Sequence, residues 1–336
     1  MSRVTRAWRL EAFGPSFRDS ARLVEQPVDD PGPGEVLVRH AFVGVNGLFD
    51  ETVARGELVY RDVRPPLDLG VEAVDTVELT GPGVTGPAPG TPVATSRFGT
   101  GYREWAVLPA DEAVPVPAAS PQYVALRTSA VSALLALTRP GELSSGETVL
   151  VTAAAGGLGQ FLVQLARLAG NHVIGVCSGP ARVALLRELG CHRPVDRTAE
   201  NLTDVLAREY PGGVDLAVDT VGTDVFDAIL EHLAPAGRLV VAGYATDQGP
   251  GRPLSVNRPR DYTKLYWKAA SIRAFQNAFY AGAHRPAFDR LLRLYADGRL
   301  RVHVDRTPFR GLAAVPDAID HLTAGRSLGK VVVDVR

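Results

Sequence analysis

The residue pattern best suited to chemistry in this chain is a turn of small residues over 151–160, Val-Thr-Ala-Ala-Ala-Gly-Gly-Leu-Gly-Gln. It follows an apolar run typical of a buried strand and opens a segment with helical periodicity. Gly156 and Gly159 match the last two glycines of the dinucleotide fingerprint, and Ala154 takes the first place. Small residues allow close approach to a diphosphate, and the helix that follows offers free N–H groups. The turn predicts a dinucleotide site; the alternative is a packing loop.

The residues after the next strand indicate which dinucleotide is bound. A site for NAD usually has an acidic residue about 20 positions beyond the glycine turn, at the end of the second strand. Here that strand ends in Val-Cys-Ser-Gly over 176–179, without an acid. Ser178 can donate to a phosphate oxygen, and Arg182 and Arg197 can pair with the 2′-phosphate of NADP. The pattern favours NADPH; the alternative is that each arginine is a solvated helix or loop residue.

The second part of the chain must supply the frame for this turn. From Tyr123 onward, strand-like runs alternate with helical patterns, which predicts an α/β fold with a doubly wound parallel sheet. Strands are expected at 147–152, 172–176, 214–218, 238–242, 271–275 and 330–335, and helices at 158–168, 183–189, 226–233, 287–296 and 313–324. The stretch 247–260 is rich in Pro, Gly and Arg and is expected to be a loop.

The first 125 residues or so have a different texture, with short apolar segments broken by Gly and Pro. Strands are expected at 35–43, 106–108 and 113–116, with turns at 31–34, 81–83 and 86–90. This pattern is typical of an all-β sequence and predicts a small barrel.

Composition sets the outer limits. A length of 336 residues favours two domains, and 46% hydrophobic with 22% charged residues is typical of a globular protein. The net charge of −1 gives no electrostatic case for nucleic acid or an anionic membrane surface. No apolar run reaches the roughly 20 residues that span a bilayer, and the first ten residues lack a signal peptide's apolar core, so a cytoplasmic location is expected. Cys177 and Cys191 are too few for a four-thiolate zinc site.

With these motifs in order, the chain resembles the zinc-independent branch of the medium-chain dehydrogenase/reductase superfamily, nearest to the prostaglandin reductase 3 type and similar to quinone oxidoreductases and enoyl reductases. The segments that carry the resemblance are 42–46, 151–157, 173–178, 189–194, 210–215 and 329–333. It implies a GroES-like barrel over 1–125, a Rossmann NADP-binding domain over 126–270, and a last segment, 271–336, that ends the Rossmann sheet and returns to the barrel. It also implies a homodimer and NADPH-dependent reduction of an activated C=C bond.

The resemblance also implies which residues bind NADPH. Ser178 and Arg182 match the serine and lysine that hold the 2′-phosphate, and Arg197 replaces a tyrosine at the same phosphate. The other residues implied at the cofactor are Asn46, Val131, Ala154, Gly156, Gly157, Leu158, Thr220, Val221, Ala242, Gly243, Tyr244, Gln248, Phe275, Gln276, Asn277 and Ser327.

The chain departs from the family's pattern in further places. The segment 129–133 reads Ser-Ala-Val-Ser-Ala where Gly-Thr-Thr-Ala is common, Gln248 stands in place of a tyrosine, and Asp75 stands where a glycine is usual. The cofactor pocket is therefore better supported than the substrate chemistry.

Few side chains are candidates for acid–base work. The barrel segment contains His40 and no cysteine, so catalytic zinc is not expected and His40 is interpreted as structural. Asn46 is a candidate hydrogen-bond donor near the nicotinamide, or else a turn residue, and Tyr244 is a candidate proton donor, or else a packing residue. The candidate substrate contacts are Asp50, Tyr60 and Tyr280, each with a structural role as the alternative.

The leading hypothesis is a zinc-independent NADPH-dependent reductase of an α,β-unsaturated carbonyl compound or a quinone. A second is a biosynthetic tailoring enzyme whose bound cofactor supports reduction, rearrangement or cyclisation, suggested by the altered segment 129–133. A third is a cofactor-binding protein without turnover.

Overall fold

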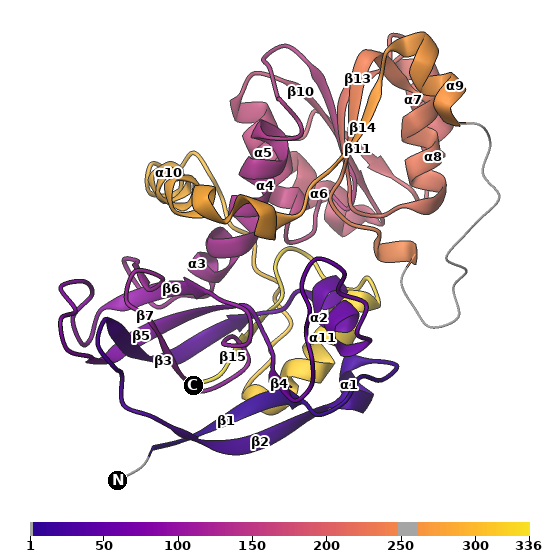
Figure 1. Cartoon of the computed structure of the whole chain (residues 1–336). Helices are drawn as coiled ribbons and strands as arrows, with labels where there is room; N and C mark the ends of the chain where they lie inside the picture. Colours follow the sequence, from indigo (N-terminus) through magenta and orange to yellow (C-terminus); the bar gives the residue numbers. More distant parts are fainter. Residues whose placement is uncertain (1–2, 248–260) are drawn as a thin grey trace. The chain divides into compact units, whose positions relative to one another are not determined.

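The computed structural model describes residues 3–247 and 261–336; Gln248 and the rest of the loop expected up to residue 260 lie outside the described residues. The chain forms two compact units, residues 1–128 with 303–336, and residues 129–302 (Figure 1). Among the described helices, none has both the length and the apolar character that crossing a bilayer requires.

The first unit contains two antiparallel sheets, with strand orders β2-β1-β4 and β15-β3-β5-β6-β8, and β7 also pairs with β3. The strands are β1 (Arg3–Leu10), β2 (Ala21–Val28), β3 (Glu35–Gly44), β4 (Leu67–Asp68), β5 (Glu72–Thr80), β6 (Pro92–Ser96), β7 (Trp105–Pro109), β8 (Val114–Pro115) and β15 (Val332–Asp334). The helices are α1 (Phe17–Ser20), α2 (Gly47–Ala54), α3 (Pro121–Ala125), η4 (Leu312–Ala314) and α11 (Val315–Thr323). The expected GroES-like antiparallel domain is confirmed, and β15 brings the end of the chain beside β3.

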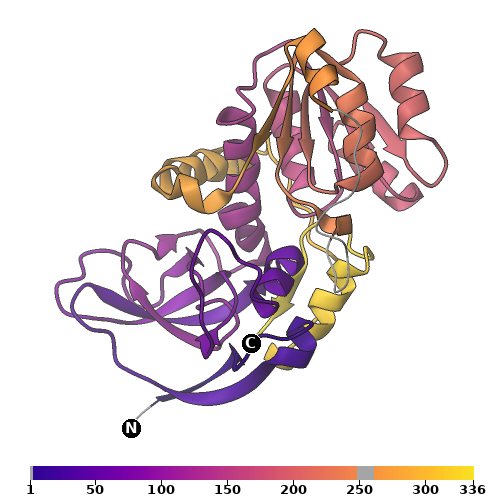
Figure 2. The same ribbon diagram turned by 45° about the vertical axis from the view of Figure 1, so that its right-hand side comes forward.

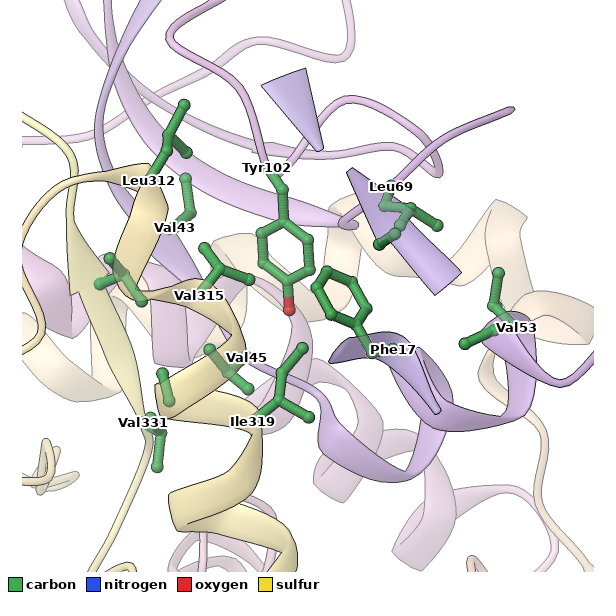
Figure 3. Close-up of a cluster of buried hydrophobic side chains, with 14 of the residues drawn as sticks. Phe17, Val43, Val45, Val53, Leu69, Tyr102, Leu312, Val315, Ile319 and Val331 are labelled. Carbon is green, nitrogen blue, oxygen red and sulfur yellow. The ribbon is translucent and has the colours of Figure 1, made fainter. Parts of the chain in front are cut away.

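Apolar residues from both ends of the chain share the core of this unit (Figure 3). Phe17 packs edge-on against Tyr102, with ring centroids 5.9 Å apart. Ile319 of α11 and Val331, which precedes β15, lie in the same cluster. All four residues are fully buried or nearly so, with exposed fractions of 0–1%. The last 34 residues therefore contribute apolar side chains to this domain's core, where these side chains are removed from water.

The second unit contains a six-stranded parallel sheet with helices on both of its faces (Figures 1 and 2). The strand order is β11-β10-β9-β12-β13-β14, with β9 (Thr148–Val151), β10 (His172–Cys177), β11 (Arg193–Asp196), β12 (Val214–Asp219), β13 (Leu233–Val241) and β14 (Ser271–Ala274). The helices are η1 (Leu126–Ala130), which crosses from the first unit, α4 (Val131–Thr138), α5 (Gly159–Leu168), α6 (Pro180–Glu188), α7 (Leu202–Glu209), α8 (Thr223–Glu231), η2 (Ala245–Asp247), α9 (Asp261–Lys268), η3 (Asn277–Ala283) and α10 (His284–Ala296). In chain order the strands read 3-2-1-4-5-6, the Rossmann arrangement, so the expected doubly wound sheet is confirmed.

One predicted helix ends too late. The helical spacing of apolar residues from Phe226 to Leu233 predicts a helix over 226–233, but α8 ends at Glu231 and Leu233 begins β13. The N–H of His232 closes α8 on Ala228 O and Ile229 O, and Leu233 then pairs with β12. Apolar periodicity does not reveal this boundary, because Leu233 is buried in either structure.

The second unit also continues beyond residue 270. It includes β14 and α10 and extends to Val302, and the chain re-enters the first unit at His303.

Candidate active site

The turn between β9 and α5 has the backbone that its small residues predict. Ala153 adopts a left-handed conformation, with φ of 43°, and is exposed. The next residue, Ala154, is buried, and its N–H donates to Val176 O of β10 at 3.0 Å. A Cβ at Gly159 would overlap Ala153 O and lie 2.6 Å from Ala154 Cα. The first turn of α5 can therefore approach the loop this closely only because Gly159 has no side chain.

The open part of this turn matches the needs of a diphosphate. Gly156, Gly157 and Leu158 are all partly exposed, directly before α5 begins. A Cβ at Gly156 would meet Ala153 O at 3.1 Å, which is tight, so a side chain there would require a small shift of the Ala153 carbonyl. The amino end of a helix presents N–H groups and a partial positive charge. The residues present therefore suit an anionic group of the size of a diphosphate.

The turn lies where the sheet changes direction. β9 and β12 are neighbours, and the chain continues from β9 to β10 on one side and from β12 to β13 on the other, so the loops after β9 and β12 diverge at this point. Ligands of open parallel sheets bind in the crevice outside such a switch point, at the carboxyl ends of the strands. Thr220 and Val221 follow β12 at this same edge, next to the glycine turn.

A buried carboxylate holds the loops after β9 and β12 together. Asp219, with 0% exposure, accepts the Thr152 hydroxyl at 2.7 Å and the Val221 N–H at 2.9 Å, both on Oδ1. Its Oδ2 accepts the Gly222 N–H at 3.0 Å, and Thr152 Oγ1 in turn accepts the Thr220 N–H at 2.8 Å. Asp219 therefore fixes the segment that includes the predicted contacts Thr220 and Val221. Sequence reasoning missed this residue, and its position at the end of a buried strand is the only signal the sequence offers.

The loop after β10 brings the predicted 2′-phosphate residues together. Ser178 is exposed, and Arg182 Nη1 donates back to Ser178 O at 2.8 Å. The N–H of Arg197 donates to Cys177 O at 2.9 Å, which ties the end of β11 to the end of β10. The neighbouring strands thus place Ser178, Arg182 and Arg197 at one edge of the sheet.

An acid from β11, Asp196, also lies at this edge. Its Oδ1 accepts the Gly179 N–H at 2.8 Å and the Thr198 hydroxyl at 2.7 Å. The Gly179 hydrogen bond, followed by those from Thr198, lowers the pKa of Asp196. The sequence argument found no acid at the end of the second strand, which is correct, but the third strand supplies one beside it. Its charge opposes a phosphate, whereas Arg182 and Arg197 favour one.

The remaining predicted cofactor residues of this unit follow β13 and β14. Ala242 donates its N–H to Asp219 O at 2.7 Å, and Phe275 donates its N–H to Val241 O at 2.8 Å, so both loops leave the same sheet edge. Gly243 is buried, and the side chain of Tyr244 is exposed at 47%. These residues follow β13 and β14, which continue the sheet on the side of β12 away from β9.

The segment after β14 is short and tightly folded. The rings of Phe275 and Tyr280 stack with centroids 5.4 Å apart and an interplanar angle of 12°. The Gln276 side chain accepts the Ala278 N–H at the start of η3, and Asn277 O faces His284 Nε2 at 3.0 Å. Tyr280 is therefore half-buried against Phe275 rather than free.

Three further predicted residues lie in different surroundings. Val131, at the start of α4, is 1% exposed, so the structure does not place it at an open surface. Ser327 is 8% exposed, in the segment between α11 and β15. Tyr60 is partly buried in the loop between α2 and β4, where burial raises the pKa of its hydroxyl.

Asn46 lies at the centre of a polar cluster in the first unit. It follows β3 directly, at the N-cap position of α2, and is partly exposed. Asn46 Oδ1 accepts from Lys330 Nζ, and Asn46 Nδ2 donates to Glu72 Oε1, both at 2.9 Å. Lys330 Nζ lies 2.5 Å from the same Glu72 oxygen and 2.9 Å from Val45 O. Sequence reasoning singled out Asn46 but neither of its two charged partners.

Asp50 lies below this cluster and is 3% exposed, so the structure does not place it at an open surface. Its Oδ2 accepts the Tyr102 hydroxyl at 2.7 Å and the Asn46 N–H at 3.0 Å. Burial raises the pKa of Asp50 to about 7, against the lowering effect of these hydrogen bonds and of Lys330. A role for Asp50 in holding the start of α2 fits this position better than direct contact with a substrate.

The potential metal ligands are dispersed or already engaged. In residues 3–247 and 261–336, no group of three His, Cys, Asp or Glu side chains has the arrangement of a metal site. His40 is buried, its Nε2 lies 2.6 Å from Thr100 O, and its Nδ1 pairs with the carboxylate of Asp75. Burial raises the pKa of Cys177 to about 11 and that of Cys191 to about 12, so neither thiol readily forms a thiolate.

Comparison with known proteins agrees with this architecture. A family model described as "Alcohol dehydrogenase GroES-like domain" matches residues 32–118, and one described as "Zinc-binding dehydrogenase" matches residues 189–333. The chain is 39% identical to prostaglandin reductase-3 of Mus musculus over 332 residues, covering 96% of this chain and 87% of that protein. It is 33% identical to a probable quinone oxidoreductase of Leishmania amazonensis, covering 98% and 97%.

A solved mycobacterial structure in complex with NADPH superposes with a TM-score of 0.82 at 27% identity, covering 98% of this chain and 99% of that one. The chain therefore belongs to the medium-chain dehydrogenase/reductase superfamily, in the branch that includes prostaglandin reductase-3 and quinone oxidoreductases.

Proposed function

We propose that this protein is an NADPH-dependent oxidoreductase that reduces the conjugated C=C bond of an α,β-unsaturated carbonyl compound or a quinone without catalytic zinc. The observation that carries the proposal is the turn before α5, with its left-handed Ala153 and its required Gly159, at the point where the strand order of the parallel sheet reverses. The names of the relatives, prostaglandin reductase-3, quinone oxidoreductase and 2-haloacrylate reductase, support this class of substrate.

The chain offers a residue for each anionic part of NADPH. The N–H groups at Gly157 and Leu158 would hold the diphosphate, while the Gly156 N–H closes the turn on Ala153 O at 2.9 Å. Ser178 would donate to the 2′-phosphate, and Arg182 and Arg197 would neutralise it. When bound, NADPH supplies the hydride for the β-carbon of the substrate.

The chain's own groups would then manage the charge and the proton. As the β-carbon is reduced, negative charge develops on the carbonyl oxygen, and an N–H donor stabilises it. The Asn46 amide is the candidate donor, since it is partly exposed and held by hydrogen bonds at both ends. The α-carbon needs a proton, for which the exposed hydroxyl of Tyr244 is the candidate source.

Zinc independence rests on the chemistry of the side chains present. Catalytic zinc needs three protein ligands such as His, Cys and Glu. The only histidine in the first 125 residues is His40. Its Nδ1 pairs with Asp75 and its Nε2 lies 2.6 Å from Thr100 O. Polarisation of the substrate carbonyl would then come from hydrogen bonds.

We further propose a homodimer. β14 is the last strand in the order of the parallel sheet. Among the described residues it pairs with β13 along one edge and with no strand along the other, so the second edge can pair with a strand of another copy. Beside it, α9 exposes Tyr266 at 75% and Trp267 at 83%, and Ile272 of β14 is exposed at 41%. A second copy would remove these apolar groups from water. A single monomeric mass in light scattering at micromolar concentration would contradict the dimer.

Binding and turnover test the main proposal. The expected results are binding of NADPH in preference to NADH, and NADPH oxidation in the presence of methyl vinyl ketone or benzoquinone. Product formation without net cofactor consumption would instead favour a tailoring reaction, and NADPH binding without turnover on any substrate would favour a binding protein. Absence of binding by either coenzyme would remove the proposal.

The 2′-phosphate assignment has its own test. The variant Arg182→Ala/Arg197→Ala is expected to lose about tenfold or more of its NADPH affinity, because charge-assisted hydrogen bonds to the phosphate are removed. Affinity for NADH should change little, since NADH has no 2′-phosphate. Arg187→Ala, an exposed arginine at the end of α6, is the matched control. Equal losses for both coenzymes would contradict the assignment.

A further inference from the structure

The Asn46 side chain does not make the hydrogen bond expected of an N-cap residue. An asparagine at the N-cap usually accepts hydrogen bonds from the first N–H groups of the helix. At the start of α2 no such side-chain bond is formed. The amide of Asn46 instead turns to Lys330 and Glu72, both fixed outside α2. The conformation is therefore set by those two residues and not by the helix.

Lys330 and Glu72 also fix which end of the amide is the oxygen. An ammonium group only donates hydrogen bonds and a carboxylate only accepts them. Asn46 Oδ1 must therefore face Lys330 Nζ, and Asn46 Nδ2 must face Glu72 Oε1, so the flipped amide is excluded. One N–H and one oxygen lone pair of Asn46 remain for another partner.

Burying the charges of Lys330 and Glu72 costs free energy of folding. Lys330 is 3% exposed and Glu72 is 0% exposed. Lys330 uses its three N–H donors on Glu72, Asn46 and Val45 O. Taking an ion pair out of water often costs as much as the pair gains, and an apolar pair of similar volume frequently serves stability as well. The contacts of this pair converge on Asn46, which indicates that its role is to orient the amide.

We propose that Lys330 and Glu72 are positioning residues that orient the Asn46 amide, so that its remaining N–H serves as the donor to the substrate's carbonyl oxygen as negative charge develops there. This inference rests on the proposed reductase function and on the proposed role of Asn46. Neither Lys330 nor Glu72 touches the reacting atoms in this account.

A double-mutant cycle tests the proposal. The neutral pair variant Glu72→Gln/Lys330→Met keeps a carbonyl acceptor for Asn46 Nδ2 and leaves no unpaired buried charge. With methyl vinyl ketone as substrate, kcat is expected to fall about tenfold to a hundredfold, while the Kd for NADPH stays within about twofold. Asn46→Ala should lower kcat to a similar extent. In the Asn46→Ala background, the pair substitution should cause little further loss, because its effect passes through the amide.

The matched control is Glu231→Gln/Lys264→Met, which removes a lysine–glutamate pair 2.8 Å apart on a more exposed surface. Wild-type kcat in the Glu72→Gln/Lys330→Met variant would overturn the proposal, as would an undiminished loss in the Asn46→Ala background. If that variant fails to fold, Gly44→Ala replaces it, since a Cβ at Gly44 would collide with the Glu72 carboxylate. Unchanged kcat in Gly44→Ala would count equally against the proposal. A wild-type protein without turnover would refute the proposed function itself, which is a different outcome.

Discussion

The Thr152 hydroxyl donates to Asp219 Oδ1 across 2.7 Å and so joins the ends of β9 and β12, the two strands at which the sheet reverses its order. Both residues are 0% exposed. Since the same carboxylate accepts the N–H groups of Val221 and Gly222, the loop after β12 is held to the glycine turn by a single buried group. The base of the proposed dinucleotide site is therefore held in place without a ligand, which would lower the ordering cost of binding.

Asp219→Asn should weaken both the fold and the cleft. An amide offers one acceptor oxygen in place of two, and its NH2 group would face N–H donors. We expect the free energy of unfolding to fall by about 1–3 kcal/mol, because a buried donor loses its partner. NADPH affinity should fall as well, since the loop after β12 loses its anchor. Urea denaturation and fluorescence titration with NADPH measure the two effects.

The control for this variant is Asp224→Asn, a carboxylate exposed at the start of α8. If Asp219→Asn were as stable as Asp224→Asn and bound NADPH equally well, the anchoring role of Asp219 would be wrong.

Gly159→Ala should abolish tight cofactor binding with a smaller effect on the rest of the fold. The new Cβ would lie 2.6 Å from Ala154 Cα and would overlap Ala153 O, so the turn must move away from α5. The N–H groups that face the diphosphate would move with it. Gly212→Ala is the matched control, because a Cβ there meets nothing within 4 Å. Isothermal titration with NADPH should show at least about a tenfold difference in Kd between the two variants; equal Kd values would contradict the assignment of this turn.

Local patterns were sufficient to predict the parallel sheet and its glycine turn. The apolar run at 147–152 and the small residues after it lie next to one another in the chain, and their chemistry depends on that local order. The sequence also indicated that Ser178 and Arg182, the proposed 2′-phosphate residues, lie close together, because they are four positions apart at the start of one helix.

The polar cluster around Asn46 could not be predicted in the same way. Lys330 and Asn46 are 284 residues apart, and only the return of the chain to the first unit brings them together. The resemblance to a family located Asn46 but did not pair it. Asp50 shows the same limit. Its spacing from Asn46 predicts that the two residues lie close together, but it does not predict that Asp50 is only 3% exposed. The burial of Asp50 depends on Tyr102, which lies in the connection between β6 and β7.

His40 and Asp75 show how an unusual residue is explained once the register is known. Asp75 stands where the family usually has glycine, and His40 is its direct cross-strand partner in the pairing of β3 with β5. Thr100 O can only accept, so His40 Nε2 must donate to it. On the other side, His40 Nδ1 pairs with the carboxylate of Asp75, whose second oxygen accepts the Thr95 hydroxyl at 2.7 Å.

Asp75→Ala should therefore destabilise the first unit strongly. It leaves the ring of His40 buried without its acceptor, a change that costs about 3–5 kcal/mol when one member of a buried pair is removed. The double variant His40→Leu/Asp75→Ala should recover part of this loss, because the imidazole is no longer buried without a partner. The recovery is not complete, since the Thr95 hydroxyl, which donates to Asp75 Oδ2 at 2.7 Å, still loses its acceptor. Urea denaturation followed by the fluorescence of Trp8 and Trp105, which lie in this unit, measures both. A double variant less stable than Asp75→Ala would show that the His40–Asp75 pair contributes more to stability than the pairing of its two polar groups.

Asp50 should make the stability of the first unit depend on pH. Its pKa rises from the ordinary value of 3.8 to about 7 in the folded chain, chiefly through burial. Between about pH 4 and pH 7 the unfolded chain has released this proton while the folded chain keeps it, so the free energy of unfolding falls as the pH rises through that window. Each unit of pKa difference corresponds to about 1.4 kcal/mol.

Asp50→Asn removes this titration but keeps a carbonyl acceptor for the Tyr102 hydroxyl and the Asn46 N–H. The wild type should therefore lose stability relative to Asp50→Asn between pH 4 and pH 7, by an amount on the order of a few kcal/mol, and the difference should stay constant above pH 7. Asp111→Asn, at an exposed position of the same unit, is the control and should follow the wild type. Parallel stability curves for the wild type and Asp50→Asn across this window would mean that Asp50 is ionised throughout, held so by Lys330 despite its burial.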